Sequence, residues 1–113
     1  MAIELNKAGF ELAKLLITQG KFNTKQEWHT AEPTTQRKQE FLKKHTIEEY
    51  GTWFLAINTD KKAGTEGYYE FPFGDFSTVF RSGIIAIKQR AGQYKHAALE
   101  TAATQLLTLI DKR

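Results

Sequence analysis

The sequence predicts a small α+β domain, and three observations support that fold class. Apolar residues recur at spacings of three and four near both ends of the chain, which is typical of amphipathic helices. Two short aromatic runs in the middle are bounded by turn-forming residues, which is typical of strands. The 113 residues are enough for one domain, 1–113, with its own hydrophobic core. We therefore expect two N-terminal helices, a central antiparallel β-hairpin and a C-terminal helical hairpin.

The first element is an amphipathic helix over 4–20. Its lysines, glutamate and threonine fall on the opposite side from an apolar stripe. The stripe consists of Leu5, Ala8, Leu12, Leu15 and Leu16. Gly20 is placed to end this helix as a left-handed cap residue, because glycine adopts positive φ at little cost.

A second, poorly amphipathic helix is expected over 33–45, with Pro33 in its first turn. Proline is favoured there because the N–H groups of the first helical turn have no acceptor within the helix, so the N–H that proline lacks is not missed. Thr46 and Glu49 then have the spacing of a capping box, in which each side chain accepts from the other's backbone N–H. This pair predicts one further helical turn.

The central hairpin is predicted from two runs, 53–57 and 68–71, joined by a glycine-containing loop. Pro72 cannot donate a hydrogen bond to a neighbouring strand, so it marks an edge or the end of the second strand. Because alternate residues of a strand share a face, Tyr69, Phe71 and Phe73 are expected to point the same way.

A long helix is predicted to begin at Asp75, a favoured N-cap residue, and to end at Gly92. Its apolar stripe consists of Phe76, Val79, Phe80, Gly83, Ile84 and Ile87. The last helix, 95–111, has its own stripe of Leu99, Ala102, Ala103, Leu106 and Ile110. Glycine inside a helix costs about 1 kcal/mol relative to alanine. We therefore expect Gly83 to allow a close approach of the alanine-rich last helix.

Composition bounds the class of protein. The chain has no cysteine, which excludes disulfides and thiolate chemistry. Its beginning lacks the pattern of a secretory signal, and no run is long and apolar enough to span a membrane, so we expect a cytoplasmic protein. Sixteen basic and 13 acidic residues leave a net charge of only +3, with the signs interspersed. That charge permits an anionic partner without indicating one.

The aromatic middle of the chain is the first candidate site. Nine of the fourteen aromatic residues fall between residues 50 and 80. If one hairpin face stays open, Trp53, Tyr68 and Tyr69 would stack on bases or be buried against a partner. The alternative is that helices cover both faces and the cluster is core, since aromatic residues dominate core energetics.

Basic residues near this region form the second candidate site: Lys61 and Lys62 in the hairpin loop, and Arg81 and Arg90 in the following helix. Arg90 differs from Arg81, because it continues the apolar stripe and would present a guanidinium beside the aromatic cluster. Its alternative role is to neutralise the negative C-terminal end of its helix.

No catalytic signature accompanies these residues. The sequence has no nucleophile elbow, phosphate-binding loop or dinucleotide fingerprint. His45 and Glu49 have the spacing of a metal pair, but two ligands are too few, so we expect neither a metal nor a cofactor. The sequence therefore favours a non-enzymatic binding protein that self-associates as a homodimer. The alternative is a nucleic-acid or nucleotide binder that uses the hairpin aromatics and nearby basic residues.

Overall fold

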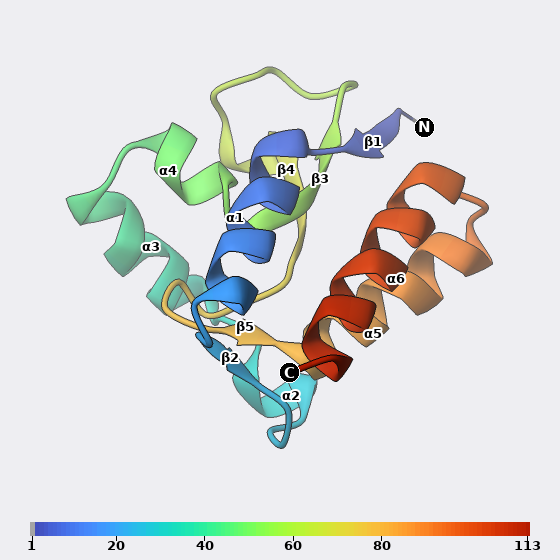
Figure 1. Cartoon of the computed structure of the whole chain (residues 1–113). Helices are drawn as coiled ribbons and strands as arrows, with labels where there is room; N and C mark the ends of the chain where they lie inside the picture. The colour runs from blue at the N-terminus through green and yellow to red at the C-terminus, as the bar shows by residue number, and fades with distance from the viewer. Residues whose placement is uncertain (1) are drawn as a thin grey trace.

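The structure is a computed structural model that describes residues 2–113. Figure 1 shows helices arranged around a three-stranded and a two-stranded sheet. The α+β fold class predicted from the sequence is confirmed. In chain order the elements are β1 (Ile3–Leu5), α1 (Lys7–Thr18), β2 (Phe22–Asn23), α2 (Trp28–Ala31), α3 (Thr35–Lys44), α4 (Ile47–Gly51), β3 (Phe54–Asn58), the 3₁₀ turn η1 (Glu66–Tyr68), β4 (Tyr69–Pro72), β5 (Val79–Phe80), α5 (Arg81–Gln93) and α6 (Ala97–Asp111).

The three-stranded sheet is antiparallel and has the order β1-β3-β4. The predicted hairpin is its β3–β4 half, with each strand displaced by one residue from the expected bounds. β1 corrects the expectation that a helix begins at residue 4, because Leu5 pairs with Ala56 on β3. Over three residues, an apolar stripe and a strand alternation give nearly the same pattern, and long-range pairing decides between them.

The start of α1 approaches β3 closely because residue 9 is glycine. A Cβ on Gly9 would collide with the backbone carbonyl oxygen of Phe54. Asn6 lies buried just before the helix and donates from Nδ2 to the carbonyl oxygens of Gly51 and Phe54, both at 2.9 Å. At the other end, Gly20 adopts φ +78° and caps α1 as predicted.

The second predicted helix is α3, which begins two residues later than expected. Thr34 is its N-cap, and the Oγ1 atom of Thr34 accepts from the Arg37 N–H at 3.1 Å. Pro33 therefore precedes the helix and does not lie in its first turn. The predicted capping box of Thr46 and Glu49 is confirmed and opens α4.

Residues 75–80 correct the prediction of a helix that starts at Asp75. The Oδ1 atom of Asp75 accepts from the N–H groups of Ser77 at 3.0 Å and Thr78 at 2.8 Å, which closes a turn. Phe76 then has φ +69°, which a right-handed helix does not allow. β5 follows and pairs in parallel with β2, so α5 begins at Arg81.

α5 and α6 form the predicted helical hairpin and lie side by side in Figure 1. The buried side of α6 is the stripe expected from the sequence. Gly83, however, faces α2: a Cβ there would lie 2.8 Å from the ring of Trp28. The expected contact of Gly83 with α6 is therefore wrong. Within residues 2–113, none of the helices is long and apolar enough to cross a membrane.

Most of the aromatic middle of the chain is core. Phe73 is fully buried, and Phe54 is 2% exposed. Phe76 lies among several rings, stacked on Phe41 with centroids 4.5 Å apart. The buried aromatic residues of this region are Tyr50, Trp53, Phe54, Phe73, Phe76 and Phe80. Helices and neighbouring loops therefore cover much of the hairpin. Of the two interpretations that the sequence allowed, an open face or a core, the core applies to most of these residues.

Candidate binding cleft

Trp53, the first candidate from the sequence, lies inside the molecule. Its side chain is 8% exposed and its ring centroid is 5.8 Å from that of Phe73 and 5.9 Å from that of Phe76. The ring is therefore occupied by packing within one chain. It offers little surface for stacking on a base or a partner.

Tyr68 and Tyr69 are half-buried at the edge of the sheet, with ring centroids 5.2 Å apart in an edge-to-face arrangement. Tyr69 packs against Tyr50 at 6.2 Å, and burial raises its pKa, with a smaller contribution from the Glu48 carboxylate. These two tyrosines are the aromatic candidates that keep an accessible surface.

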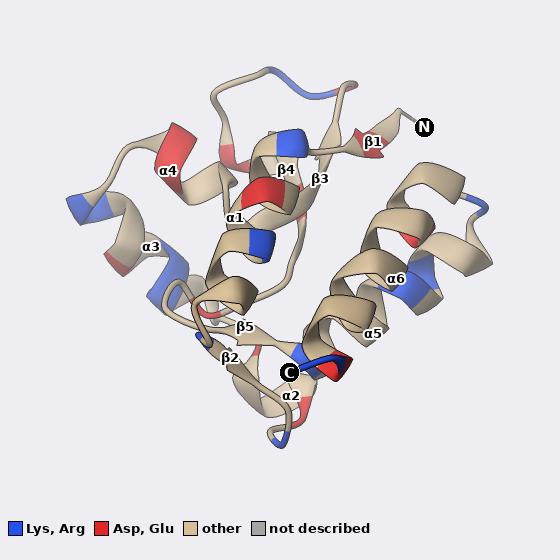
Figure 2. Cartoon of the chain, in the orientation of Figure 1, with Lys and Arg blue, Asp and Glu red and all other residues tan. Residues whose placement is uncertain are grey.

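The basic candidates are not brought together. Lys61 and Lys62 lie on the exposed loop after β3. Arg81 is paired with Asp111, with Nε 2.9 Å from Oδ1, and this hydrogen bond lowers the pKa of the Asp111 carboxyl. In Figure 2 the basic loop after β3 lies at the top of the view, whereas α5 begins next to β5 in the lower half. They do not form a common patch with the hairpin aromatics.

Arg90 has a different environment. It is exposed in the last turn of α5, and its guanidinium carbon lies 5.9 Å from the ring centroids of both Phe71 and Tyr94. The ion pairs found among residues 2–113 do not include it. Arg90 is thus a cation held beside two aromatic rings, without a carboxylate partner in the described chain.

A cleft of about 420 Å³ opens beside Arg90, between α2, the end of β4 and the C-terminal half of α5. Its volume lies at the small end of the range for ligand pockets. One part of its lining is apolar and another part carries charge or amide groups. The lining residues are Trp28, Glu32, Phe71, Pro72, Ala86, Ile87, Gln89, Arg90 and Gln93.

The wall formed by Trp28 is held in place by contacts with α5. The ring of Trp28 lies against Gly83, where a side chain would displace it, and its centroid is 6.2 Å from that of Phe80. Ser82 donates from Oγ to the carbonyl oxygen of Gln26 at 2.8 Å, just before α2. These contacts dock α2 on α5 and form one side of the cleft.

The lining of the cleft also contains a residue with a strained backbone. Phe71 adopts φ +64°, a conformation that is rare for a bulky side chain. Strand alternation would place Phe71 on the same face as Phe73, but Phe73 is fully buried while Phe71 is half-buried and lines the cleft. Such backbone strain clusters at functional sites in proteins, but the buried Phe76 also has a positive φ. The strain at Phe71 together with the neighbouring Arg90 makes this cleft the leading candidate.

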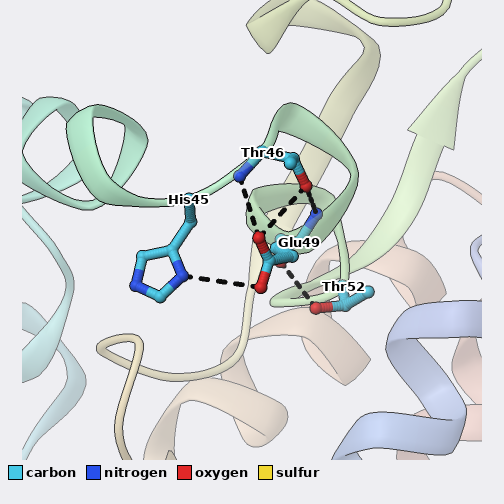
Figure 3. Close-up of polar contacts among 4 residues, drawn as sticks. All are labelled: His45, Thr46, Glu49 and Thr52. Atoms are coloured by element: carbon cyan, nitrogen blue, oxygen red, sulfur yellow. Dashed lines mark hydrogen bonds and ion pairs between the residues drawn. The ribbon is translucent and has the colours of Figure 1, made fainter.

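His45 and Glu49 form a separate polar cluster, shown in Figure 3. The Nδ1 atom of His45 lies 3.5 Å from Oε2 of Glu49, and its ring stacks on Phe41 at 3.9 Å. The Thr46 N–H donates to Oε1 of Glu49 at 2.9 Å, and this bond is the main reason that the pKa of Glu49 is lowered. The cluster caps α4, and no group of three metal-binding side chains occurs within residues 2–113.

Comparison with known proteins adds no relative. No protein-family model matches the chain, and no curated protein or solved structure is significantly similar to it. Of the cleft residues, Arg90 was a site candidate in the sequence, whereas Trp28, Phe71 and Glu32 were not. The feature of the sequence that could have indicated the cleft is Trp28, a lone tryptophan in an otherwise polar segment. This feature says little as long as the position at which α2 docks is unknown.

Proposed function

We propose that this chain is a non-catalytic binding protein and that the cleft beside Arg90 is its binding site. The observation that carries the proposal is the guanidinium of Arg90, which has no carboxylate partner within residues 2–113 and lies beside Phe71 and Tyr94 in the lining of a formed cleft. A cation without a partner beside apolar surface favours an anionic ligand that also carries an apolar group.

The lining chemistry favours binding over catalysis. Its ionisable side chains are Glu32 and Arg90, and its other polar side chains include the amides of Gln89 and Gln93. Arginine and amide groups orient a ligand through hydrogen bonds but do not exchange protons at neutral pH. A general acid–base pair or an activated nucleophile would require other side chains within hydrogen-bond reach.

Self-association stays a prediction, and the surface expected to mediate it is now limited to one edge of the three-stranded sheet. Trp53 and Phe54 are covered within one chain, which leaves Tyr68 at the end of η1 and Tyr69 at the start of β4 as the candidate aromatic surface for a dimer. β4 is also an edge strand, and open edges are sites of strand addition. Sedimentation equilibrium tests it: a mass of 12.9 kDa at every concentration contradicts the dimer.

Nucleic-acid binding is the less favoured alternative, because Lys61 and Lys62 lie apart from Arg81 and from the cleft. A polyanion is bound best by a continuous basic surface. A single-stranded oligonucleotide is therefore a useful competitor. Binding that falls steeply with salt and depends on the two lysines would support the alternative.

Amide chemical-shift mapping with four one-ring fragments tests the cleft itself. Benzoate, phenyl phosphate, benzylamine and benzamide differ in charge but share a ring. We expect at least one of the anions to shift amides in α2, at Phe71 and in the last two turns of α5. Arg90→Gln should remove those shifts.

Arg37→Gln is the matched control, because Arg37 also lies beside an aromatic ring, 5.6 Å from the centroid of Phe76, but outside the cleft. It should leave the fragment shifts unchanged. Absence of shifts for all four fragments, or shifts centred elsewhere, would contradict the proposed site.

A further inference from the structure

We infer that the cleft recognises the free C-terminal carboxylate of an extended peptide whose last residue is apolar. This inference rests on the proposed function and adds the class of ligand. It follows from three features of the cleft: the balance of charge, the guanidinium of Arg90, and the mixture of apolar and amide groups in the lining.

The charge balance favours one carboxylate over a phosphate group. The cleft contains one cation, Arg90, and one carboxylate, Glu32. Arg90 also lies in the last turn of α5, where backbone carbonyl groups give the helix end a partial negative charge. Glu32 and this helix end repel any anion in the cleft, and they repel a dianion about twice as strongly as a monoanion. With Arg90 as the one cation of the lining, a monoanion is the better match.

The position of Arg90 suits a planar, two-oxygen acceptor. The rings of Phe71 and Tyr94 lie beside the guanidinium, each with its centroid 5.9 Å from the guanidinium carbon, while the Arg90 side chain stays exposed to a ligand. An arginine guanidinium presents two parallel N–H groups, and these match the two oxygens of a carboxylate.

The rest of the lining suits the end of a peptide chain. Trp28, Pro72 and Ile87 provide an apolar surface beside Arg90 for the last side chain. Gln89 and Gln93 lie one turn or less from Arg90 on α5 and also line the cleft. Their amides have both donors and acceptors, as a peptide backbone requires. A free amino acid offers these amides an ammonium group but no peptide N–H or C=O.

Fluorescence polarisation with two labelled peptides tests the inference. Both carry fluorescein at the N-terminus and the sequence Gly-Gly-Ala-Phe, and one ends in a free carboxylate while the other ends in an amide. We expect the acid to bind about 10- to 100-fold more tightly, the difference typical of a charge-assisted hydrogen bond. Arg90→Gln should remove this preference, and Arg37→Gln should preserve it.

The remaining outcomes overturn different statements. If the acid and the amide peptide bind equally well, or if phenyl phosphate competes better than unlabelled acid peptide, the cleft is not specific for a carboxylate. If free phenylalanine competes as strongly as the peptide, the ligand need not be a peptide. If the fragments shift the cleft amides but neither peptide binds, the inference fails and the proposed function stands. If neither fragments nor peptides bind, both fail.

Discussion

The junctions at the N-terminal ends of α1 and α5 each combine a polar side chain that donates to a backbone carbonyl with a glycine that allows a close contact, but the two junctions differ in their surroundings. At the start of α1, Asn6 donates to backbone carbonyls and Gly9 lets the helix approach β3. At the start of α5, Ser82 donates to the carbonyl of Gln26 and Gly83 lets Trp28 approach. In the first junction, which is buried, the glycine contacts backbone atoms of β3. In the second, which is partly exposed, the glycine contacts the side chain of Trp28.

This difference separates a rigid part of the fold from an adjustable one. A backbone carbonyl such as that of Phe54 cannot move without disturbing β3 and the hydrogen bonds it makes. The ring of Trp28 forms a wall of the candidate cleft, and a side chain can change its rotamer without breaking a sheet. We therefore expect changes at the α1 junction to affect global stability, and changes at the α5 junction to affect mainly the cleft.

The largest effect is expected for Gly9→Ala. The new methyl group would collide with the Phe54 carbonyl, so we expect a loss of about 3 kcal/mol, at the upper end for overpacking. Urea unfolding followed by circular dichroism measures it. Gly92→Ala is the control, since its Cβ would meet the flexible carboxylate of Glu100 at 3.0 Å and the helix gains up to about 1 kcal/mol. Equal stability of both variants would refute the rigid junction.

Alkaline pH provides the second test of the packed side. Burial raises the pKa of Tyr50 to about 12, from 10.0, with a smaller contribution from Glu66. The folded state therefore holds its proton more tightly than the unfolded state. The resulting stability is fully present below about pH 10 and is lost as the pH rises toward 12.

Tyr50→Phe should remove this part of the alkaline loss, because phenylalanine keeps the ring packing against Phe54 and does not ionise. Unfolding free energies of the variant and the wild type should therefore converge or cross between about pH 10 and 12. Parallel pH profiles for the two proteins would show that water reaches Tyr50 freely.

Features set by neighbouring residues were predictable from the sequence. The capping box of Thr46 and Glu49 and the stripe of α6 depend on local spacing, and both are confirmed. Two other expectations that rested on local spacing failed. Leu15, placed on the apolar stripe of the first helix, is 52% exposed, and Asp75 closes a turn where an N-cap was expected.

The candidate site was predictable only in part. Arg90 stood out because it continues the apolar stripe, and it does lie beside aromatic rings. The cleft itself depends on α2, which docks on α5 more than 50 residues later in the chain. It also depends on the positive φ of Phe71, which no residue preference favours. Long-range docking and backbone strain leave no periodic pattern in a sequence.

A smaller effect is expected for Gly83→Ala. Displacing the Trp28 ring, 2.8 Å from the new Cβ, costs about 1–3 kcal/mol, while helix propensity returns about 1 kcal/mol. We expect a net loss of about 1 kcal/mol, together with a shift in tryptophan emission and weaker fragment binding in the cleft. Unchanged emission and binding would show that the Trp28 wall does not depend on residue 83.

The smallest effect on global stability is expected for Ser82→Ala, which removes the hydrogen bond to the Gln26 carbonyl at 2.8 Å. This bond is exposed, so water replaces the hydroxyl and the loss should be about 0.5 kcal/mol. Its local effect should be larger, because α2 has only four residues and few hydrogen bonds of its own. Faster amide hydrogen exchange at Ala31 and Glu32, with almost unchanged urea unfolding, is the expected result. A global loss as large as that of Gly9→Ala would show instead that both junctions belong to one rigid unit, and that the cleft wall is no more adjustable than the core.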